Sequence, residues 1–488
     1  MNQFIDIDKV LGLLKYDSSA PLIFNSGLFL FLFLAFTLLY YLLRKKDTAR
    51  ILFVTLFSYY FYYKSSGMHF LILAVVTMSD YLIAGRIAQV GKTRGKWLIA
   101  LSLLVDLGML AYFKYTNFLI QIWNGMSGMN VGAMDIVLPV GISFFTFQSL
   151  SYTIDVYRRN IKPLDRLLDY AFYVSFFPQL VAGPIVRARD FIPQIHSPRV
   201  LNNEMMSRAV FLIIIGLIKK AVISDYISLN FVDRIFEQPN LYSGIENLLG
   251  IYGYTLQIYC DFSGYSDMAI GIALLLGYEF PINFDSPYKS ASITEFWRRW
   301  HISLSSWLRD YLYISMGGNR KGKFRTYVNL MLTMLIGGLW HGASLNFVCW
   351  GGLHGLFLVI ERMLGIGKKK SRGIVRLVRV VITFNLVAFA WLFFRNTSFE
   401  NSLLMVERVF GNFNPQLFPQ VIKGYSIVMG LIAVGFVAHW MPAGVMNGVK
   451  RIFARTPLVI QALLMVLAVW VVIQVKSSEI QPFIYFQF

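Results

Sequence analysis

Long apolar runs recur along almost the whole chain and are separated only by short polar breaks. A helix needs about 20 residues to cross the hydrocarbon core of a bilayer, so runs of about 18 or more predict membrane-spanning helices. The composition agrees, because only 15% of the 488 residues are charged and 56% are hydrophobic. A soluble chain carries roughly 25% charged residues. The sequence therefore predicts an all-α, polytopic integral membrane protein that spans the bilayer about 11 times and is surrounded by membrane lipid.

The predicted spans share this length and apolar character, and they lie near residues 22–43, 51–63 with 68–84, 97–122, 167–185, 208–228, 245–276, 326–340, 343–364, 376–394, 423–441 and 456–475. Two segments, residues 136–152 and 176–186, are interrupted by Pro and Gly. In lipid their free backbone groups would be unsatisfied. We therefore expect these two segments to be re-entrant, interfacial or buried helices that form part of an internal cavity wall.

The net charge of +19 comes from Lys and Arg in short clusters between the apolar runs. Such clusters are typical of cytoplasmic loops, which favours a membrane protein over a nucleic-acid-binding protein. The clusters at residues 44–46, 86–96, 158–159 and 368–372 place the extreme N-terminus outside. The first residues lack the pattern of a cleaved signal peptide. No internal repeat or linker marks a second domain, so we expect one membrane domain over residues 1–488.

Neither cysteine indicates a metal centre or a disulfide. Cys260 and Cys349 lie in apolar surroundings without metal-ligand spacing, so we interpret both as small core residues. The sequence predicts no metal site and no permanently bound cofactor.

The most informative stretch is residues 259–355. It begins with Asp261 and Asp267 in an otherwise apolar predicted helix. Ionisable groups at membrane depth are costly, so we expect both to face inward or toward a helix end. Pairing with a nearby Arg and a functional role both remain open.

A segment rich in arginine and aromatic residues follows between Thr294 and Tyr311, and a glycine-rich basic turn follows it. Positive charges beside free backbone amides could receive phosphates, and coenzyme A is one candidate. The residues predicted to bind it are Arg298, Arg299, Arg320 and Lys321. An ordinary cytoplasmic positive-inside loop explains the same residues.

His341 is the strongest local feature, because it ends an apolar run between Gly338 and Gly342. Glycines at this spacing let helices approach closely. A histidine in apolar surroundings stays neutral, which is the form that a general base needs. A buried histidine is more often a satisfied core residue, so this feature alone does not establish catalysis. His354, also among glycines, could extend a polar path or only pack, and we assign no role to His69, His196 or His439.

These motifs together resemble the membrane-bound O-acyltransferase (MBOAT) family, and within it the bacterial alginate O-acetyltransferase branch. That branch includes relatives acting on peptidoglycan and cellulose and is similar to the teichoic-acid D-alanyl transfer protein. The matching segments are residues 178–185, 259–267, 280–284, 296–311 and 338–342. The resemblance covers most of the chain and is weakest after Arg395.

The resemblance implies a catalytic role for two histidines. His341 occupies the place of the near-invariant histidine of the family, and His301 that of its second conserved polar position. Eukaryotic relatives often have Asn or Asp at that second position. Whether His301 orients the substrate or shares proton transfer remains open.

The resemblance also implies an architecture and a reaction. Bent helices would enclose a funnel or tunnel in the bacterial inner membrane, and acetyl-CoA would enter from the cytoplasm past the arginine-rich segment. The acetyl group would leave toward the outer face for O-acetylation of an exported polysaccharide, which we expect to be alginate-like, with peptidoglycan and cellulose as further acceptors.

The resemblance further implies a separate extracytoplasmic transferase of the SGNH-hydrolase type. The short polar connections fit this expectation, because they leave no room for a soluble domain of about 100 residues. The alternative function is a transporter or flippase of a cell-envelope polysaccharide pathway without covalent chemistry. We find no inverted repeat of the kind common in transporters. A non-enzymatic scaffold is a third possibility.

Overall fold

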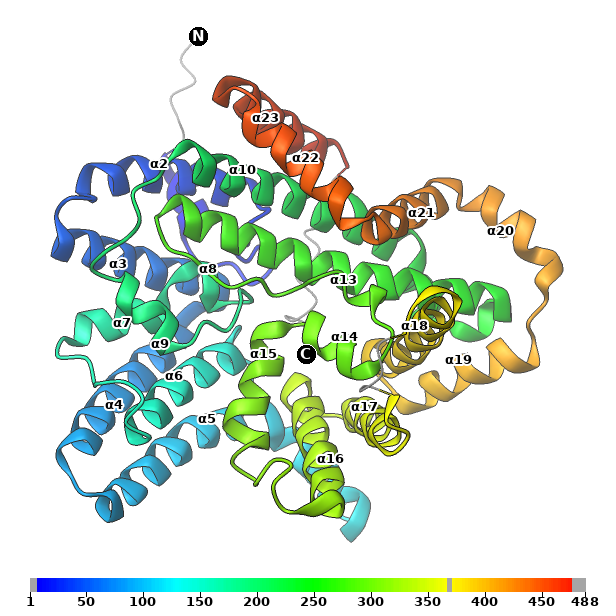
Figure 1. Cartoon of the computed structure of the whole chain (residues 1–488), viewed down its shortest axis with the longest axis horizontal. Helices are drawn as coiled ribbons and strands as arrows, with labels where there is room; N and C mark the ends of the chain where they lie inside the picture. Colours follow the sequence, from blue (N-terminus) through cyan, green and yellow to red (C-terminus); the bar gives the residue numbers. More distant parts are fainter. Residues whose placement is uncertain (1–6, 367–370, 476–488) are drawn as a thin grey trace. The chain divides into compact units, whose positions relative to one another are not determined.

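The computed structural model describes residues 7–366 and 371–475 (Figure 1). These residues form helices joined by turns, and no strand occurs among them, which confirms the all-α prediction. By their contacts they form two compact units, residues 1–209 with 268–281 and residues 210–267 with 282–488. The prediction of a single domain stays a prediction, and the basic cluster at residues 368–372 lies mostly outside the described residues.

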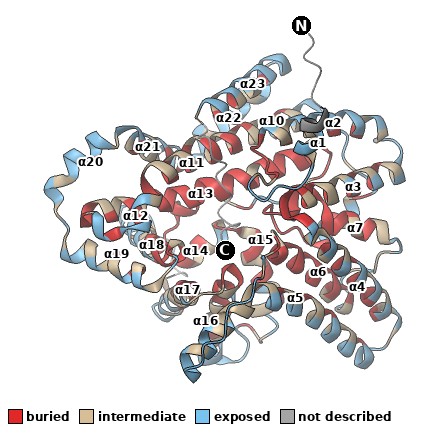
Figure 2. Ribbon diagram, turned by 180° about the vertical axis from the view of Figure 1, so that it is seen from behind, coloured by how far each residue is buried: buried red, intermediate tan, exposed pale blue. Residues whose placement is uncertain are grey.

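The helices of the first unit are α1 (Ile7–Leu14), α2 (Gly27–Leu43), α3 (Asp47–Ser66), α4 (Phe70–Gln89), α5 (Lys92–Ser127), α6 (Ile142–Tyr157), α7 (Leu167–Ser175), α8 (Phe177–Leu180), α9 (Ala188–Phe191) and the first half of α10 (Asn203–Leu217), whose second half belongs to the second unit. The interrupted segment 136–152 becomes α6, which begins only after a turn at Gly141. Gly141 has a φ of 74°, a torsion that costs little without a side chain. Every residue from 142 to 153 is buried, so α6 lies inside the unit, as expected (Figure 2).

The predicted span at residues 167–185 is wrong as a single helix. Helix α7 ends at Ser175, and Phe176 adopts an extended ψ of 108° before the short helix α8. Pro178 follows within α8 and Gly183 and Pro184 lie after it, so no regular helix can continue through this segment. The break lies inside segment 176–186, where the sequence predicted an interruption.

The helices of the second unit are α11 (Asp225–Ile227), α12 (Asp233–Glu237), α13 (Gly244–Leu275, whose last residues belong to the first unit), α14 (Ile293–Arg299), α15 (Ile302–Trp307), α16 (Gly322–His341), α17 (Leu345–Met363), α18 (Gly373–Arg395), α19 (Phe399–Gly411), α20 (Phe418–Gly424), α21 (Ser426–Trp440), α22 (Ala443–Arg455) and α23 (Leu458–Val475). Three wider π-helical turns lie at Ile218–Ser224, Ser228–Val232 and Leu308–Tyr313. Such turns are frequent at functional sites. Helix α13 is buried along most of its length, whereas α22 and α23 are largely exposed (Figure 2).

Several helices have the length and apolar character of membrane spans. Within the described part of the chain, four segments qualify: Asp47–Gln89, Lys92–Ser127, Gly373–Arg395 and Leu458–Val475. A fifth is possible if Pro415–Gly424 and Ser426–Trp440, bent by 97°, form one broken span. The count of about 11 spans stays a prediction.

The outward faces of these helices are apolar. Trp97 and Leu104 on α5, and Val459 and Leu463 on α23, are all exposed. In water such faces would be aggregation-prone, whereas lipid tails are a suitable solvent for them. The exposed residues and the spans together define a membrane protein.

Candidate active site

His341 is the last residue of α16, and a short turn leads from it into α17, which packs beside α16 (Figure 1). The two helices are close because glycines lie at their contact. A Cβ on Gly338 would overlap the carbonyl oxygen of Phe347, and one on Gly351 would overlap the carbonyl oxygen of Met334. The predicted close approach at Gly338 is confirmed, and it fixes His341 where the two helices join.

The ring of His341 is enclosed by aromatic side chains from three helices. Trp350 of α17 and Phe394 of α18 each meet it edge to face, with ring centroids 5.1 Å away. Trp340 of α16 lies 4.9 Å away, and only 3% of His341 is exposed. This enclosure excludes bulk water, and electrostatic interactions are stronger in such a site than in water.

His301 is the N-cap residue of α15 and is held in a strained conformation, with a φ of 42° and a ψ of 56°. Left-handed torsions at a residue other than glycine cost of order 1 kcal/mol or more and persist only where the surroundings enforce them. Here Asn283 does so, because its backbone carbonyl accepts from the N–H of Ile302 at 2.9 Å. Its side-chain Oδ1 lies 3.2 Å from Nδ1 of His301.

The contacts of Asn283 also determine the tautomer of His301. Oδ1 of Asn283 accepts from the N–H and the hydroxyl of Ser303 at 3.2 and 2.9 Å, while its amide group donates to Oγ of Ser266 at 3.1 Å. Because Oδ1 is an acceptor, Nδ1 of His301 must donate to it. Burial lowers the pKa of His301, which lies outside the candidate spans, to about 3. The ring is therefore neutral near pH 7, and Nε2 is its basic nitrogen.

Trp340 connects the two predicted histidines. Its ring centroid lies 6.2 Å from that of His301 and 4.9 Å from that of His341. Phe262 of α13 contacts His301 edge to face at 4.6 Å. The structure therefore brings both predicted catalytic residues into one buried aromatic cluster inside the second unit.

His354 of α17 joins the same cluster. Its Nδ1 accepts a hydrogen bond from the indole N–H of Trp297 at 3.3 Å, and its ring lies 4.9 Å from Trp350. Trp350 also contacts His341, so one aromatic ring separates the two histidines. The sequence left the role of His354 open, and the structure places it between the arginine-rich segment and His341.

A cavity of about 540 Å³ adjoins this cluster within the second unit. Its walls come from α14, α15, α16, α17 and the π-helical turn Leu308–Tyr313, and Trp297 is one of its lining residues. The charged side chains that line it are Arg298, Arg309, Glu361 and Arg362. A polar molecule in this cavity would be one aromatic side chain away from His354.

The charged lining residues differ in their partners. Arg298 and Arg362 form no ion pair with any described residue, whereas Arg309 pairs with the adjacent Asp310 at 2.6 Å. Glu361 is only 5% exposed, and its Oε2 accepts from the N–H of Thr294 at 2.9 Å. Its Oε1 is buried and has no hydrogen-bond partner among the described residues.

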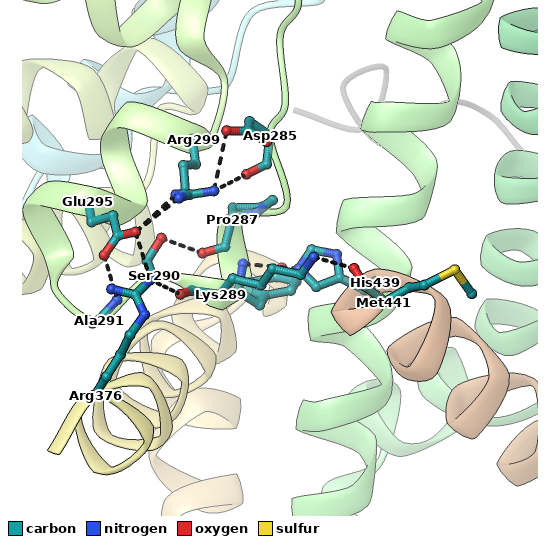
Figure 3. A network of polar contacts seen from close by, with 11 residues as sticks. Asp285, Pro287, Lys289, Ser290, Ala291, Glu295, Arg299, Arg376, His439 and Met441 are labelled. Atoms are coloured by element: carbon teal, nitrogen blue, oxygen red, sulfur yellow. Dashed lines mark hydrogen bonds and ion pairs between the residues drawn. The ribbon is translucent and has the colours of Figure 1, made fainter. Parts of the chain in front are cut away.

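The four basic residues predicted to bind a donor are separated by the structure. Arg298 lines the cavity. Arg299 instead forms ion pairs with Glu295 at 3.1 Å and Asp285 at 3.3 Å, as Figure 3 shows. Arg320 and Lys321 lie exposed in the turn before α16 and do not line the cavity. Arg309 and Arg362 line it beside Arg298.

Asp261 and Asp267 pair with lysines rather than with arginines. Lys220 lies 2.5 Å from Asp261, and Lys219 lies 2.7 Å from Asp267. Both lysines belong to the π-helical turn Ile218–Ser224, which these pairs hold against α13. In residues 7–366 and 371–475, no group of three or more His, Cys, Asp and Glu is arranged to hold a metal ion.

Sequence reasoning missed three contributors to this site. Asn283 lay inside a matched segment, residues 280–284, but nothing indicated that it would hold His301. Glu361 and Arg362 lie at the end of an apolar run without any motif. Only the packing of α17 against α14 reveals that they face a cavity.

The comparison with known families agrees with the all-helical membrane fold. The sequence model of the membrane-bound O-acyltransferase family matches residues 94–371. This segment is more than half of the chain and includes His301, His341 and every residue that lines the cavity. The chain belongs to the membrane-bound O-acyltransferase family, which confirms the resemblance.

Curated relatives cover most of the chain. A probable alginate O-acetylase, AlgI, of Pseudomonas putida KT2440 is 38% identical over 494 residues, which cover 96% of this chain and 100% of the relative. The corresponding protein of Pseudomonas aeruginosa PAO1 is 44% identical over 397 residues, or 80% of this chain and 75% of the relative. A peptidoglycan O-acetyltransferase of Helicobacter pylori 26695 is 37% identical over 423 residues, or 80% of each chain. Family and relatives together identify a membrane O-acyltransferase.

Proposed function

We propose that this protein transfers acetyl groups from cytoplasmic acetyl-CoA toward an exported, alginate-like polysaccharide at the bacterial inner membrane. The relatives named for alginate and for peptidoglycan support both the acetyl group and a polysaccharide acceptor. Peptidoglycan and cellulose remain acceptors of the same class. We retain the prediction of about 11 spans around a tunnel, with the arginine-lined cavity open to the cytoplasm, because basic residues are held on that side.

One observation carries the proposal: His341 lies in a dry aromatic cluster that adjoins a cavity lined by three arginines, two of which, Arg298 and Arg362, form no ion pair with any described residue. A basic cavity suits the phosphates of coenzyme A. The buried imidazole of His341 suits proton transfer, and it is connected to the cavity through Trp350, His354 and Trp297. Neither feature alone indicates acyl transfer, but their connection within the second unit supports it.

In the proposed reaction, His341 removes the proton of an acceptor hydroxyl while that oxygen attacks the thioester carbonyl carbon. A new C–O bond forms, the C–S bond breaks, and the proton passes to the departing thiolate of coenzyme A. General base catalysis supplies about 10²–10⁴-fold, so positioning and charge stabilisation must supply the rest.

His301 shares proton transfer in this scheme rather than polarising the carbonyl. Its Nδ1–H is used by Asn283, so Nε2 can only accept a hydrogen bond while the ring is neutral. An acceptor cannot polarise a carbonyl oxygen, but it can hold or receive the proton of a hydroxyl. His301 would therefore hold the attacking hydroxyl by its one proton before the attack, and His341 would take that proton as the C–O bond forms.

We further propose that a separate extracytoplasmic transferase of the SGNH-hydrolase type receives the acetyl group and esterifies the polymer. The connections between helices in this chain are short and cannot contain such a domain.

The test uses purified protein with acetyl-labelled acetyl-CoA and a hydroxyl acceptor, and it measures release of the free thiol of coenzyme A. We expect release that depends on the acceptor and is lost in His341→Ala. A transporter or flippase would bind or move its substrate without releasing coenzyme A.

A further inference from the structure

We propose that Glu361 recognises the pantetheine arm of the acyl donor by accepting a hydrogen bond from one of its amide or hydroxyl groups. This role rests on the proposed function, because it requires a coenzyme A thioester in the cavity. It makes Glu361 a specificity-determining residue of the donor site.

The two oxygens of Glu361 have different surroundings. Oε2 accepts from the N–H of Thr294 in the first turn of α14 at 2.9 Å, so it fixes the side chain in place. Oε1 is buried and without a hydrogen-bond partner among the described residues, although Glu361 lines the cavity. Leaving a buried acceptor unsatisfied costs free energy, so a ligand that donates to it is favoured.

The charges in the cavity determine which part of a donor Glu361 can meet. Arg298 and Arg362 have no ion-pair partner among the described residues and can receive phosphates. A carboxylate repels phosphate, so Glu361 must face an uncharged part that carries N–H or O–H groups. The pantetheine arm is that part of coenzyme A, because it joins the phosphates to the thioester through amides and a hydroxyl.

The position of Trp297 gives the direction of the donor. Trp297 lines the same cavity and donates to His354, which contacts the aromatic cluster around His341. The thioester end would therefore point toward Trp297, with the pantetheine arm beside Glu361 and the phosphates beside the arginines.

The substitution Glu361→Gln tests recognition of the pantetheine arm separately from the capping of helix α14. The amide oxygen of Gln can still accept from Thr294, but an NH₂ donor then replaces the acceptor Oε1. The matched control is Glu246→Gln, because Glu246 also caps a helix, accepting from the N–H and hydroxyl of Ser243 at 2.8 and 2.7 Å, and it does not line the cavity.

The experiment measures KM and kcat with two donors, acetyl-CoA and S-acetyl-pantetheine, which lacks the phosphates and the nucleotide. We expect Glu361→Gln to raise KM about tenfold or more for both donors, because an acceptor faces the arm that they share. Arg298→Gln should raise KM for acetyl-CoA only. Glu246→Gln should leave both KM values unchanged.

The two proposals fail in distinguishable ways. If the wild-type protein releases no coenzyme A from acetyl-CoA, the proposed function is wrong and the inference falls with it. If the wild type is active and Glu361→Gln has a wild-type KM for both donors, only the inference is wrong and Glu361 is a helix cap. If the variant does not accumulate, wild-type protein is tested with a pantetheine donor whose amide N–H groups are replaced by ester oxygens and whose hydroxyl is removed. Unchanged KM with that donor would also overturn the inference.

Discussion

The two sides of helix α14 differ in how their charges are compensated. On one side, Arg299 and Glu295 form a closed network with Asp285 and Arg376, which ties the preceding loop to α14 and α18 (Figure 3). On the other side, Arg298 faces a cavity without an ion-pair partner among the described residues. Two adjacent arginines in one motif thus have different surroundings.

The same contrast extends along both sides. In the loop before α14, Lys289 donates to the carbonyl of Met441 at 2.7 Å, and the N–H of Tyr288 donates to His439 at 3.1 Å (Figure 3). The Nζ of Lys289 and the N–H of Tyr288 are therefore bonded within the protein, whereas Nδ1 of His439 is buried without a hydrogen-bond partner among the described residues. On the cavity side, Glu361 has a buried oxygen without such a partner. The difference is that Glu361 lines the cavity and His439 does not, so only on the cavity side does a buried atom without a partner belong to the ligand site that we propose.

The largest loss of activity should come from replacing His341, the proposed general base. We expect His341→Ala to lower acetyl transfer at least 10²-fold with normal accumulation of the protein, because a lost base removes chemistry without removing a helix. Activity is measured as coenzyme A release per mole of folded protein. His69→Ala, in the first unit, is the control for loss of a histidine, and wild-type activity of His341→Ala would refute its catalytic role.

A smaller effect should follow from disturbing the support of His301. Asn283→Ala removes the acceptor that fixes the tautomer of His301, so activity should fall about tenfold, less than in His301→Ala. The comparison is made as kcat at saturating donor. Equal activity of Asn283→Ala and wild type would show that the tautomer is not needed.

The two adjacent arginines provide the direct test of the contrast across α14. Arg298→Gln should raise the KM for acetyl-CoA several-fold and leave the unfolding temperature unchanged. Arg299→Gln should lower the unfolding temperature by a few degrees, because it leaves Glu295 and Asp285 with fewer partners. Michaelis kinetics and thermal unfolding in detergent are measured on both variants. The reverse pattern would mean that Arg299 contacts the donor.

The smallest effect concerns a structural contact of the first unit. His196 contacts Asp47 and lies 3.0 Å from Asp169, and the hydrogen bond to Asp47 raises the pKa of His196 although burial opposes this. Since the folded pKa lies above the unfolded one, the stabilisation is complete below about pH 6.5 and is lost as pH rises through the folded pKa.

The measurement is the difference in unfolding temperature between wild type and His196→Gln. We expect wild type to be more stable than His196→Gln at about pH 5.5, and we expect this difference in unfolding temperature to shrink at about pH 8.5. At each pH the two proteins should transfer acetyl groups at the same rate. A pH-independent difference would mean that the contact does not depend on protonation of His196.

The parts predicted from sequence are those that depend on local pattern. Apolar run length predicted helices such as α5 and α23, and the glycine spacing at Gly338 predicted a close helix approach, which the structure shows to be with α17. Motifs indicated His341 and His301, and the structure brings them together around Trp340. These features need only neighbouring residues or a recurring family pattern.

The remainder depends on contacts between distant segments. Glu361 caps α14 from 67 residues away, and Arg299 was indistinguishable from Arg298 until its partners were known. The span predicted at residues 167–185 overlaps the interrupted segment 176–186. The length of the apolar run favoured one helix there, but the Pro and Gly residues of the segment end it. Pairing and cavities arise from tertiary packing, which a single sequence does not display.

The most direct test of the central claim is transport of the acetyl group in sealed vesicles. The chain is reconstituted with acetyl-labelled acetyl-CoA inside, on the side of the arginine-lined cavity, and an SGNH-type transferase with polysaccharide outside. The account predicts label on the external polymer that requires both proteins and disappears in His341→Ala. Label appearing at the wild-type rate with His341→Ala, or only when acetyl-CoA is supplied outside, would contradict it.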